Sequence, residues 1–234
     1  MPRRPIVAID GPAASGKSTT ARAVALELGF CHFDSGALYR TITLLALDLP
    51  GPAGSWRGEA LVAAARERRV AAVPRGAALE VAVDGAPAGE AIRSEAVTRE
   101  VSRVAAMPAV RDFVNGLLRA AAREGGVVAD GRDIGTVVFP DAEVKVFLVA
   151  DAGERARRRL AERRAATDEA SVRAEADALV ARDARDAGRD VAPLRPAPDA
   201  ILVDTTGLDF AEQVSRVVAL VRRLGEGAGS GAVA

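Results

Sequence analysis

The chain of 234 residues carries 32 basic and 32 acidic side chains, and 49% of its residues are hydrophobic. This composition is that of a globular protein and excludes an intrinsically disordered one. The formal net charge of zero argues against nucleic-acid binding through bulk electrostatics. One cysteine and one histidine exclude an intrachain disulfide framework and a Cys/His zinc cluster. With few cysteines and no apolar run of membrane-spanning length, we expect a cytoplasmic protein.

The first predicted strand leads into a glycine-rich loop. The apolar run Ile6–Ile9 predicts a buried strand, and Lys17–Leu28 has the spacing of a helix. Between them, Gly11–Ser18 (the P-loop) reads G-x-x-x-x-G-K-S, a pattern that binds phosphate with backbone N–H groups at a helix start. Lys17 is expected to reach the β- and γ-phosphates of a nucleotide, and Ser18 to bind Mg²⁺. ATPases, GTPases and kinases share this loop, so it does not identify the phosphate acceptor.

Strands and helices alternate along the rest of the chain, which predicts a parallel α/β sheet. The predicted elements are a strand at Cys31–Phe33, helices at Gly36–Leu47 and Glu59–Arg69, a β-hairpin turning at Asp84-Gly85, helices at Ser94–Ala106 and Pro108–Arg123, strands at Val127–Asp130 and Val144–Val149, a helix at Ala152–Arg185, a strand at Ile201–Asp204 and a helix at Phe210–Leu224. The small, polar segment Gly225–Ala234 predicts a disordered tail. Cys31 and His32 are expected to be packing residues without a catalytic role.

Three polar clusters, Asp34–Arg40, Asp130–Gly135 and Arg182–Asp190, carry most of the remaining chemistry. The first two follow predicted strands, where open α/β sheets bind ligands. Arginine binds phosphate with bidentate geometry and a permanent charge, so together the clusters indicate the acceptor side of a phosphoryl-transfer cleft. Each cluster taken alone is also typical of a capped helix, a strand-end turn or a solvated helix end.

As a set, these motifs resemble the bacterial cytidylate kinases (CMP/dCMP kinases), which are nucleoside monophosphate kinases with a P-loop. The matching stretches are Ile9–Thr19, Asp34–Arg40, Ile92–Val97, Val101–Arg111, Val128–Leu148 and Arg182–Leu194. The resemblance covers about Ile6–Leu224, although Gly51–Arg69 matches poorly. It implies a P-loop fold with a five-stranded parallel sheet flanked by helices. Residues 1–60 and 96–224 would form the core, residues 61–95 a small inserted monophosphate-binding lobe, and about 152–190 a helical lid.

The resemblance also implies the residues that bind the two nucleotides. The ATP phosphates would be bound by Gly11, Ala13, Ala14, Ser15, Gly16, Lys17, Ser18 and Thr19, with Arg155 from the lid. In the acceptor, the phosphate would be bound by Ser35, Arg40, Arg132 and Arg189, the cytosine by Ser102, Arg111 and Asp133, and the ribose by Arg182 and Asp186. The catalytic groups would be Lys17, Arg132, Arg159 and Arg189. Mg²⁺ would be bound by Ser18 and, through water, by Asp130.

The implied reaction is ATP + CMP ⇌ ADP + CDP, with dCMP as a second acceptor. Two alternatives stay open. The first is a kinase of the same architecture for another small acceptor, such as UMP, AMP or shikimate. The second is a P-loop protein that binds a nucleotide as a regulator and transfers no phosphate. We expect small nucleotides as ligands, no binding to nucleic acid or membranes, and a monomer.

Overall fold

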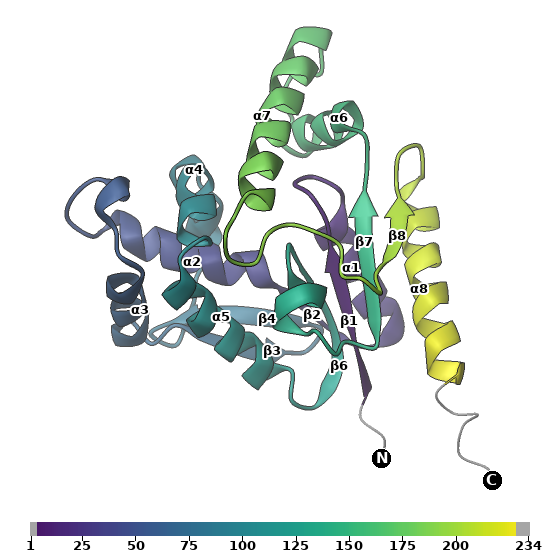
Figure 1. Cartoon of the computed structure of the whole chain (residues 1–234), viewed down its shortest axis with the longest axis horizontal. Coiled ribbons are helices and arrows are strands. Elements are labelled where there is room, and N and C mark those ends of the chain that lie inside the picture. Colours follow the sequence, from purple (N-terminus) through teal and green to yellow (C-terminus); the bar gives the residue numbers. More distant parts are fainter. Residues whose placement is uncertain (1–3, 228–234) are drawn as a thin grey trace.

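A computed structural model describes residues 4–227 and contains one central, mostly parallel sheet flanked by helices (Figure 1). Five parallel strands lie in the order β2-β6-β1-β7-β8. Their bounds are β1 (Arg4–Asp10), β2 (Cys31–Asp34), β6 (Gly125–Gly131), β7 (Val144–Val149) and β8 (Ile201–Asp204). The mixed α/β fold with a parallel sheet is therefore confirmed for the described part of the chain.

The predicted hairpin is present, and it extends the same sheet. Strands β3 (Ala71–Arg75), β4 (Ala78–Val83) and β5 (Ala86–Pro87) are antiparallel, and β4 joins β2 through the pair His32 and Ala78. The turn between β4 and β5 has positive φ at Asp84 (+53°) and Gly85 (+85°), as an Asp-Gly hairpin turn requires. The boundaries of a separate lobe at 61–95 stay a prediction.

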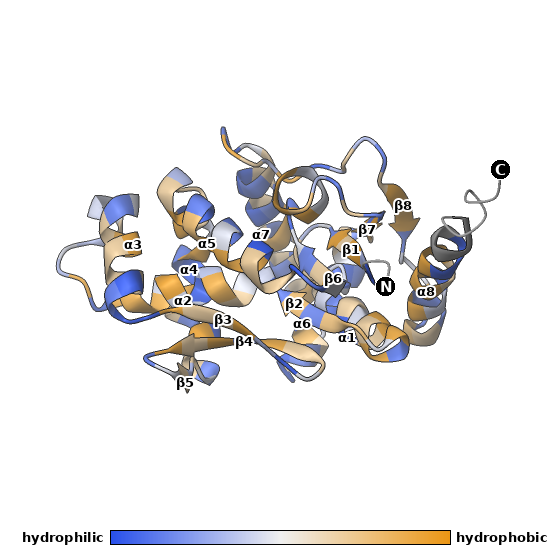
Figure 2. Cartoon of the chain, turned by 90° about the horizontal axis from the view of Figure 1, so that it is seen from below, coloured by the Kyte–Doolittle hydropathy of each residue, from blue (hydrophilic) through white to orange (hydrophobic). Residues whose placement is uncertain are grey.

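Helices cover both faces of the sheet. Their bounds are α1 (Lys17–Leu28), α2 (Ser35–Leu47), α3 (Gly58–Glu67), α4 (Glu95–Val104), α5 (Pro108–Ala121) and α8 (Phe210–Gly227), with short 3₁₀ turns at Ala53–Ser55 and Glu90–Arg93 and a π-helical turn at Ile134–Val138. Because strand side chains alternate between faces, Val7 and Ile9 pack with α1 and α8, while Ile6 and Ala8 pack with α2–α5. The visible faces of β4 and β8 are coloured as hydrophobic in Figure 2.

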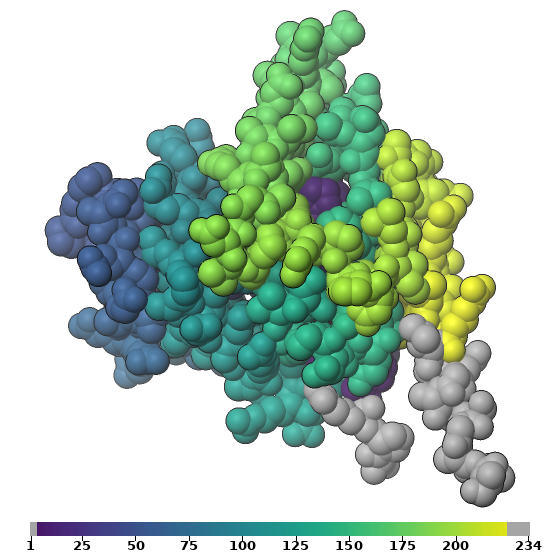
Figure 3. Space-filling view, in the orientation of Figure 1, coloured from purple at the N-terminus to yellow at the C-terminus, as the bar shows by residue number. Residues whose placement is uncertain are grey.

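The predicted helix Ala152–Arg185 is instead two helices, α6 (Ala152–Glu162) and α7 (Glu169–Ala187). The break has a local cause. Arg164 takes a positive φ of +53° at the end of α6, and the carboxylate of Asp168 accepts the Ser171 N–H at 3.0 Å to start α7. Both helices project from the sheet in Figure 1, and Figure 3 shows the purple N-terminal segment behind α7.

The C-terminal helix also differs from expectation. Helix α8 continues to Gly227, so the first residues of the predicted tail, Gly225–Gly227, are helical. Residues 228–234 lie outside the described part of the chain. No helix between residues 4 and 227 has the length and apolar character needed to cross a membrane.

Candidate active site

A cleft of about 830 Å³ opens between the P-loop, the carboxyl ends of β2 and β6, and the helix α7. Among the described residues, ten basic and six acidic side chains line it. This excess of positive charge suits anionic ligands. The predicted site residues that line the cleft are Ala13, Ala14, Gly16, Lys17, Ser18, Thr19, Ser35, Arg40, Ser102, Arg111, Asp130, Arg132, Asp133, Arg159, Arg182, Asp186 and Arg189. The structure therefore brings together the three polar clusters and the P-loop, whereas Gly11, Ser15 and Arg155 lie outside this lining.

The P-loop has a backbone that requires its two glycines. A Cβ on Gly11 would lie 2.3 Å from the carbonyl oxygen of Leu148, and Gly16 has a φ of +82°. Lys17 begins α1, and its Nζ donates to the carbonyl oxygen of Pro12 at 3.0 Å. Burial, followed by the charge of Arg132, lowers the pKa of Lys17 to about 7. Lys17 is therefore only partly protonated at neutral pH, and an anionic phosphate beside it would favour the charged ammonium form.

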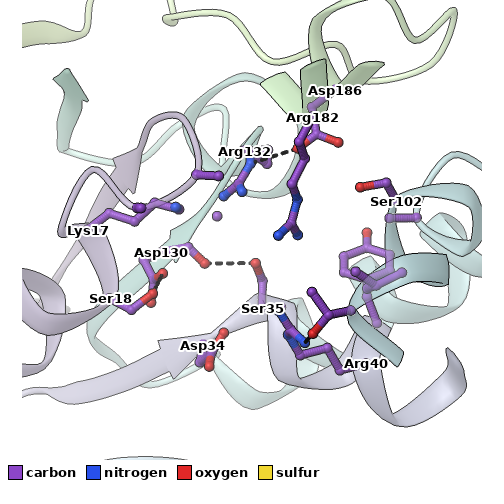
Figure 4. A pocket seen from close by; sticks show the side chains of 18 of the residues that line it. Lys17, Ser18, Asp34, Ser35, Arg40, Ser102, Asp130, Arg132, Arg182 and Asp186 are labelled. Atoms are coloured by element: carbon purple, nitrogen blue, oxygen red, sulfur yellow. Dashed lines mark hydrogen bonds and ion pairs between the residues drawn. The ribbon is translucent and has the colours of Figure 1, made fainter. Parts of the chain in front are cut away.

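Ser18, the last residue of the P-loop, and Asp130 place side-chain oxygens next to each other in the cleft (Figure 4). Ser18 Oγ donates to Asp130 Oδ2 at 2.5 Å, and Asp130 Oδ1 lies 2.7 Å from Nε2 of His32. Burial raises the pKa of Asp130, but the hydrogen bonds from His32 and Ser18 and the charges of His32 and Lys17 together outweigh it, and the net shift is downward. The carboxylate is therefore ionised at neutral pH.

These donors fit Mg²⁺, which binds hard oxygen ligands and takes few of them from the protein when a nucleotide supplies others. Between residues 4 and 227 no group of three or more His, Cys, Asp or Glu side chains could hold a metal ion. Ser18 and Asp130 would thus share the ion with phosphate oxygens. The hydrogen bond between His32 and Asp130 was not predicted, because a single histidine on a short strand carries no pattern.

Arginines from α7, from the residues just after it and from the loop after β6 converge around Asp186, which is 1% exposed. The Asp186 carboxylate accepts from Arg132 Nε at 3.1 Å and from Arg189 Nη2 at 2.5 Å. Burial, then the neighbouring charge of Arg132, lowers the pKa of Arg182 to about 10. Figure 4 shows Arg132, Arg182 and Asp186 next to one another. Helix α7 and the loop after β6 thus meet through one buried carboxylate.

Two further predicted site residues, Ser35 and Arg40, lie across the cleft from the arginines around Asp186. Ser35 Oγ, at the start of α2, donates to the backbone carbonyl of Asp130 at 2.7 Å. Arg40 Nη1 donates to Thr98 Oγ1 at 2.9 Å, which joins α2 to α4. Figure 4 shows both side chains below Arg182. An acceptor phosphate between them and Arg132 would be surrounded by donors.

Asp133 and Arg111 form a buried ion pair at the far end of the cleft. They are 4% and 2% exposed, and Arg111 Nη2 donates to Asp133 Oδ2. Arg111 also donates to the carbonyl oxygen of Ala105 at 2.9 Å. The pair is thereby fixed in orientation, as a site that reads hydrogen-bonding groups requires.

Asp10 anchors the turn that carries Asp133, a role that the sequence did not reveal. Its carboxylate accepts the N–H groups of Ile134 and Gly135, each at 2.8 Å. Burial raises the pKa of Asp10 to about 7, against the effect of these hydrogen bonds. The signal available in the sequence was an acidic residue at the end of an otherwise apolar strand.

Arg155 and Arg159, predicted to bind the ATP phosphates and to act in catalysis respectively, make different contacts. Arg159 lines the cleft and pairs with Glu175 of α7 at 2.9 Å. Arg155 Nη1 instead donates to Asp183 of α7 at 2.5 Å and to the carbonyl oxygen of Ala13 at 2.9 Å. Asp183 in turn accepts the N–H of Ala13 at 2.9 Å. Arg155 is therefore used to join α6, α7 and the P-loop, because it lies on the inner side of the helix pair.

The chain is similar to one known protein family along most of its length. The family model described as cytidylate kinase matches residues 7–223. A cytidylate kinase of Desulfitobacterium hafniense (strain Y51) is 48% identical over 92% of this chain and 91% of that protein. A bifunctional pantoate ligase/cytidylate kinase of Synechococcus sp. (strain JA-3-3Ab) is 46% identical over 97% of this chain. The match covers only 42% of that relative's length.

One solved structure shows the same fold at low sequence identity. It is an uncharacterized protein from Eubacterium ventriosum ATCC 27560, with a TM-score of 0.50, 11% identity, and coverage of 94% of this chain and 99% of that one. This likeness concerns the fold alone. The family match and the identity to the Desulfitobacterium protein together show that the chain belongs to the cytidylate kinase family.

Proposed function

We propose that this chain transfers the γ-phosphoryl group of ATP to CMP or dCMP. The observation that carries the proposal is the shared cleft, in which the P-loop, the arginines around Asp186 and the buried Arg111–Asp133 pair line one space. A regulator that only binds a nucleotide needs no second set of arginines. Family membership and the printed function of the Desulfitobacterium relative support the same reaction.

On the donor side, the P-loop N–H groups and Lys17 bind the ATP phosphates. Ser18 and, through water, Asp130 hold Mg²⁺, which when bound neutralises charge on the phosphate oxygens. Arg159 reaches the cleft from α6 and adds a permanent positive charge where the transferred group passes. The ammonium and guanidinium groups are buried or half-buried, so they need little reorganisation during transfer.

On the acceptor side, Ser35, Arg40, Arg132 and Arg189 bind the phosphate, and Arg182 and Asp186 bind the ribose. Ser102 and the Arg111–Asp133 pair read the base. A carboxylate accepts a hydrogen bond from the 4-amino group of cytosine, whereas uracil presents a carbonyl oxygen that the carboxylate repels. This difference favours CMP over UMP.

In the transfer step, an oxygen of the CMP phosphate forms a bond to the γ-phosphorus while the bond from that phosphorus to the β–γ bridging oxygen breaks. ADP leaves with the electron pair of that bond, and CDP is formed. The attacking oxygen is already anionic at neutral pH, so no side chain has to remove a proton. The protein contributes alignment and charge neutralisation.

The lid excludes water from the transferred group, which would otherwise be hydrolysed. The contact of Asp183 with the Ala13 N–H places α7 directly against the P-loop. The division into core, inserted lobe and lid, the monomeric state and a cytoplasmic location belong to this proposal as well. Limited proteolysis, light scattering and cell fractionation test them.

The test of function is ADP release from Mg·ATP with CMP, dCMP, UMP, AMP and shikimate as separate acceptors. Turnover confined largely to CMP and dCMP is expected. Turnover mainly with another acceptor would reject the cytosine assignment, and ATP binding without any acceptor-stimulated ADP release would favour a regulator. The Lys17→Met variant serves as the control for contaminating kinases.

A further inference from the structure

We propose that His32 is a positioning residue for the donor site: its imidazole holds the Asp130 carboxylate in the orientation that lets Asp130 and Ser18 serve Mg²⁺. The proposal rests on the proposed function, because it concerns the Mg·ATP side of the same cleft. Neither the family resemblance nor the P-loop motif assigns a role to His32.

The sheet itself brings His32 to Asp130. In the parallel pair β2 and β6, His32 lies opposite Val128, and Asp34 lies opposite Asp130. Paired residues and residues two apart point to the same face of a sheet, so His32 and Asp130 share the face that α1 covers. The imidazole is 4% exposed, and its Nε2 lies 2.7 Å from Asp130 Oδ1.

Each carboxylate oxygen of Asp130 has one partner. Oδ2 accepts the hydroxyl hydrogen of Ser18 at 2.5 Å, which leaves the lone pairs of Ser18 Oγ available to a cation. Oδ1 accepts from His32, because an ionised carboxylate can only accept and Nε2 must therefore carry the hydrogen. With both oxygens fixed, the carboxylate cannot turn toward the nearby ammonium of Lys17.

An apolar residue of similar size in place of His32 would fill the same space but would leave Oδ1 buried without this donor. The unsatisfied oxygen is expected to lower stability, and the carboxylate, free to turn, is expected to weaken metal binding. Replacing a side chain that orients a metal ligand typically weakens metal affinity by about 10- to 100-fold. The hydrogen bond, and not the volume of the side chain, carries the role.

The test compares His32→Gln with His32→Met, two side chains of similar length of which only Gln keeps a donor. Two quantities are measured: the Mg²⁺ concentration for half-maximal turnover, and the calorimetric Kd for ATP with Mg²⁺ and with EDTA. His32→Met is expected to raise the Mg²⁺ requirement by about 10- to 100-fold and to weaken ATP binding only when Mg²⁺ is present. His32→Gln is expected to restore most of both.

Thr43→Val is the matched control. Thr43 is fully buried, and its Oγ1 donates to the Tyr39 carbonyl oxygen at 2.7 Å, away from the P-loop, so its loss should change stability without changing the Mg²⁺ requirement. If His32→Met does not fold, His32→Asn replaces it, since this shorter amide cannot reach Oδ1 and should show the same defect.

Two results would overturn the proposal: a wild-type Mg²⁺ requirement in the folded Met or Asn variant, or equal defects in the Gln and Met variants. Failure of the proposed function gives a different pattern. In that case wild-type protein releases no ADP with CMP, yet the calorimetric difference between the Gln and Met variants persists.

Discussion

The buried pair of Asp133 and Arg111 makes base selection testable through a single atom. Asp133→Asn keeps the shape of the side chain and replaces one carboxylate oxygen by an amide nitrogen, which can donate to the carbonyl of uracil. Because Asp133 is 4% exposed, water does not compete for its hydrogen bond to the base. A hydrogen bond to a charged group contributes about 1.5–3 kcal/mol, so the CMP preference over UMP should fall by roughly 10- to 150-fold.

The assay is kcat/KM for CMP and for UMP, measured by ADP release. Arg189→Ala is the matched control, since loss of a phosphate ligand should lower turnover with both bases and leave their ratio unchanged. Both Asp133→Asn and Asp133→Ala remove the carboxylate that pairs with the buried Arg111, a loss that costs about 3–5 kcal/mol of stability when no partner remains. Asn keeps an oxygen that can accept from Arg111, whereas Ala keeps none, so Asp133→Asn is the better test of base selection. An unchanged CMP/UMP ratio in folded Asp133→Asn would refute the assignment of Asp133 to the base.

Three further variants test other parts of the structure. Burial raises the pKa of Asp10 from 3.8 to about 7. The stability that protonated Asp10 contributes is therefore complete below pH 3.8 and is lost as pH rises through 7, by up to about 4 kcal/mol. The free energy of unfolding of Asp10→Asn, measured in urea, should depend less on pH, and an unaltered pH dependence would contradict this. Asp183→Ala removes the acceptor of the Ala13 N–H and the partner of Arg155, so it should lower the free energy of unfolding by about 1–3 kcal/mol. It should also speed amide hydrogen exchange in α7. Unchanged exchange in α7 would argue against the contact between Asp183 and the P-loop. Lys17→Met should reduce kcat by about 10²- to 10³-fold without lowering Tm, because a buried ammonium is removed; a large loss of Tm would show that Lys17 is structural.

The strands along the chain and the P-loop were predictable because local patterns determine them. The run Ile6–Ile9 is apolar at every position, which is typical of a strand buried on both faces. The sharp turns at Gly11 and Gly16 then fix the loop. Helices α6 and α7 were predicted as one helix, because the helix-forming residues around Arg164 include no proline or glycine to mark the break. In the structure, the break is marked by the left-handed backbone of Arg164 and by the Asp168 side chain that caps α7.

The site was less predictable wherever a contact joins residues distant in sequence. His32 and Asp130 are brought together by the pairing of β2 and β6, which no local pattern encodes. Arg155 and Arg159 lie on adjacent turns of α6, and their different partners follow from where α7 packs. The roles of the remaining site residues came from the resemblance and stay predictions.

The sheet separates two hydrophobic cores, and this has a consequence for how the acceptor preference can change. Arg40, Ser102 and Arg111 lie on α2, α4 and α5, which pack in the core containing Ile6 and Ala8, whereas the helix that follows the P-loop packs in the other. Substitutions in the first core can therefore shift the side chains that we propose bind the acceptor, while the P-loop keeps its shape. Under the proposed function, acceptor specificity can change, in evolution or in laboratory selection, with the proposed donor side left intact.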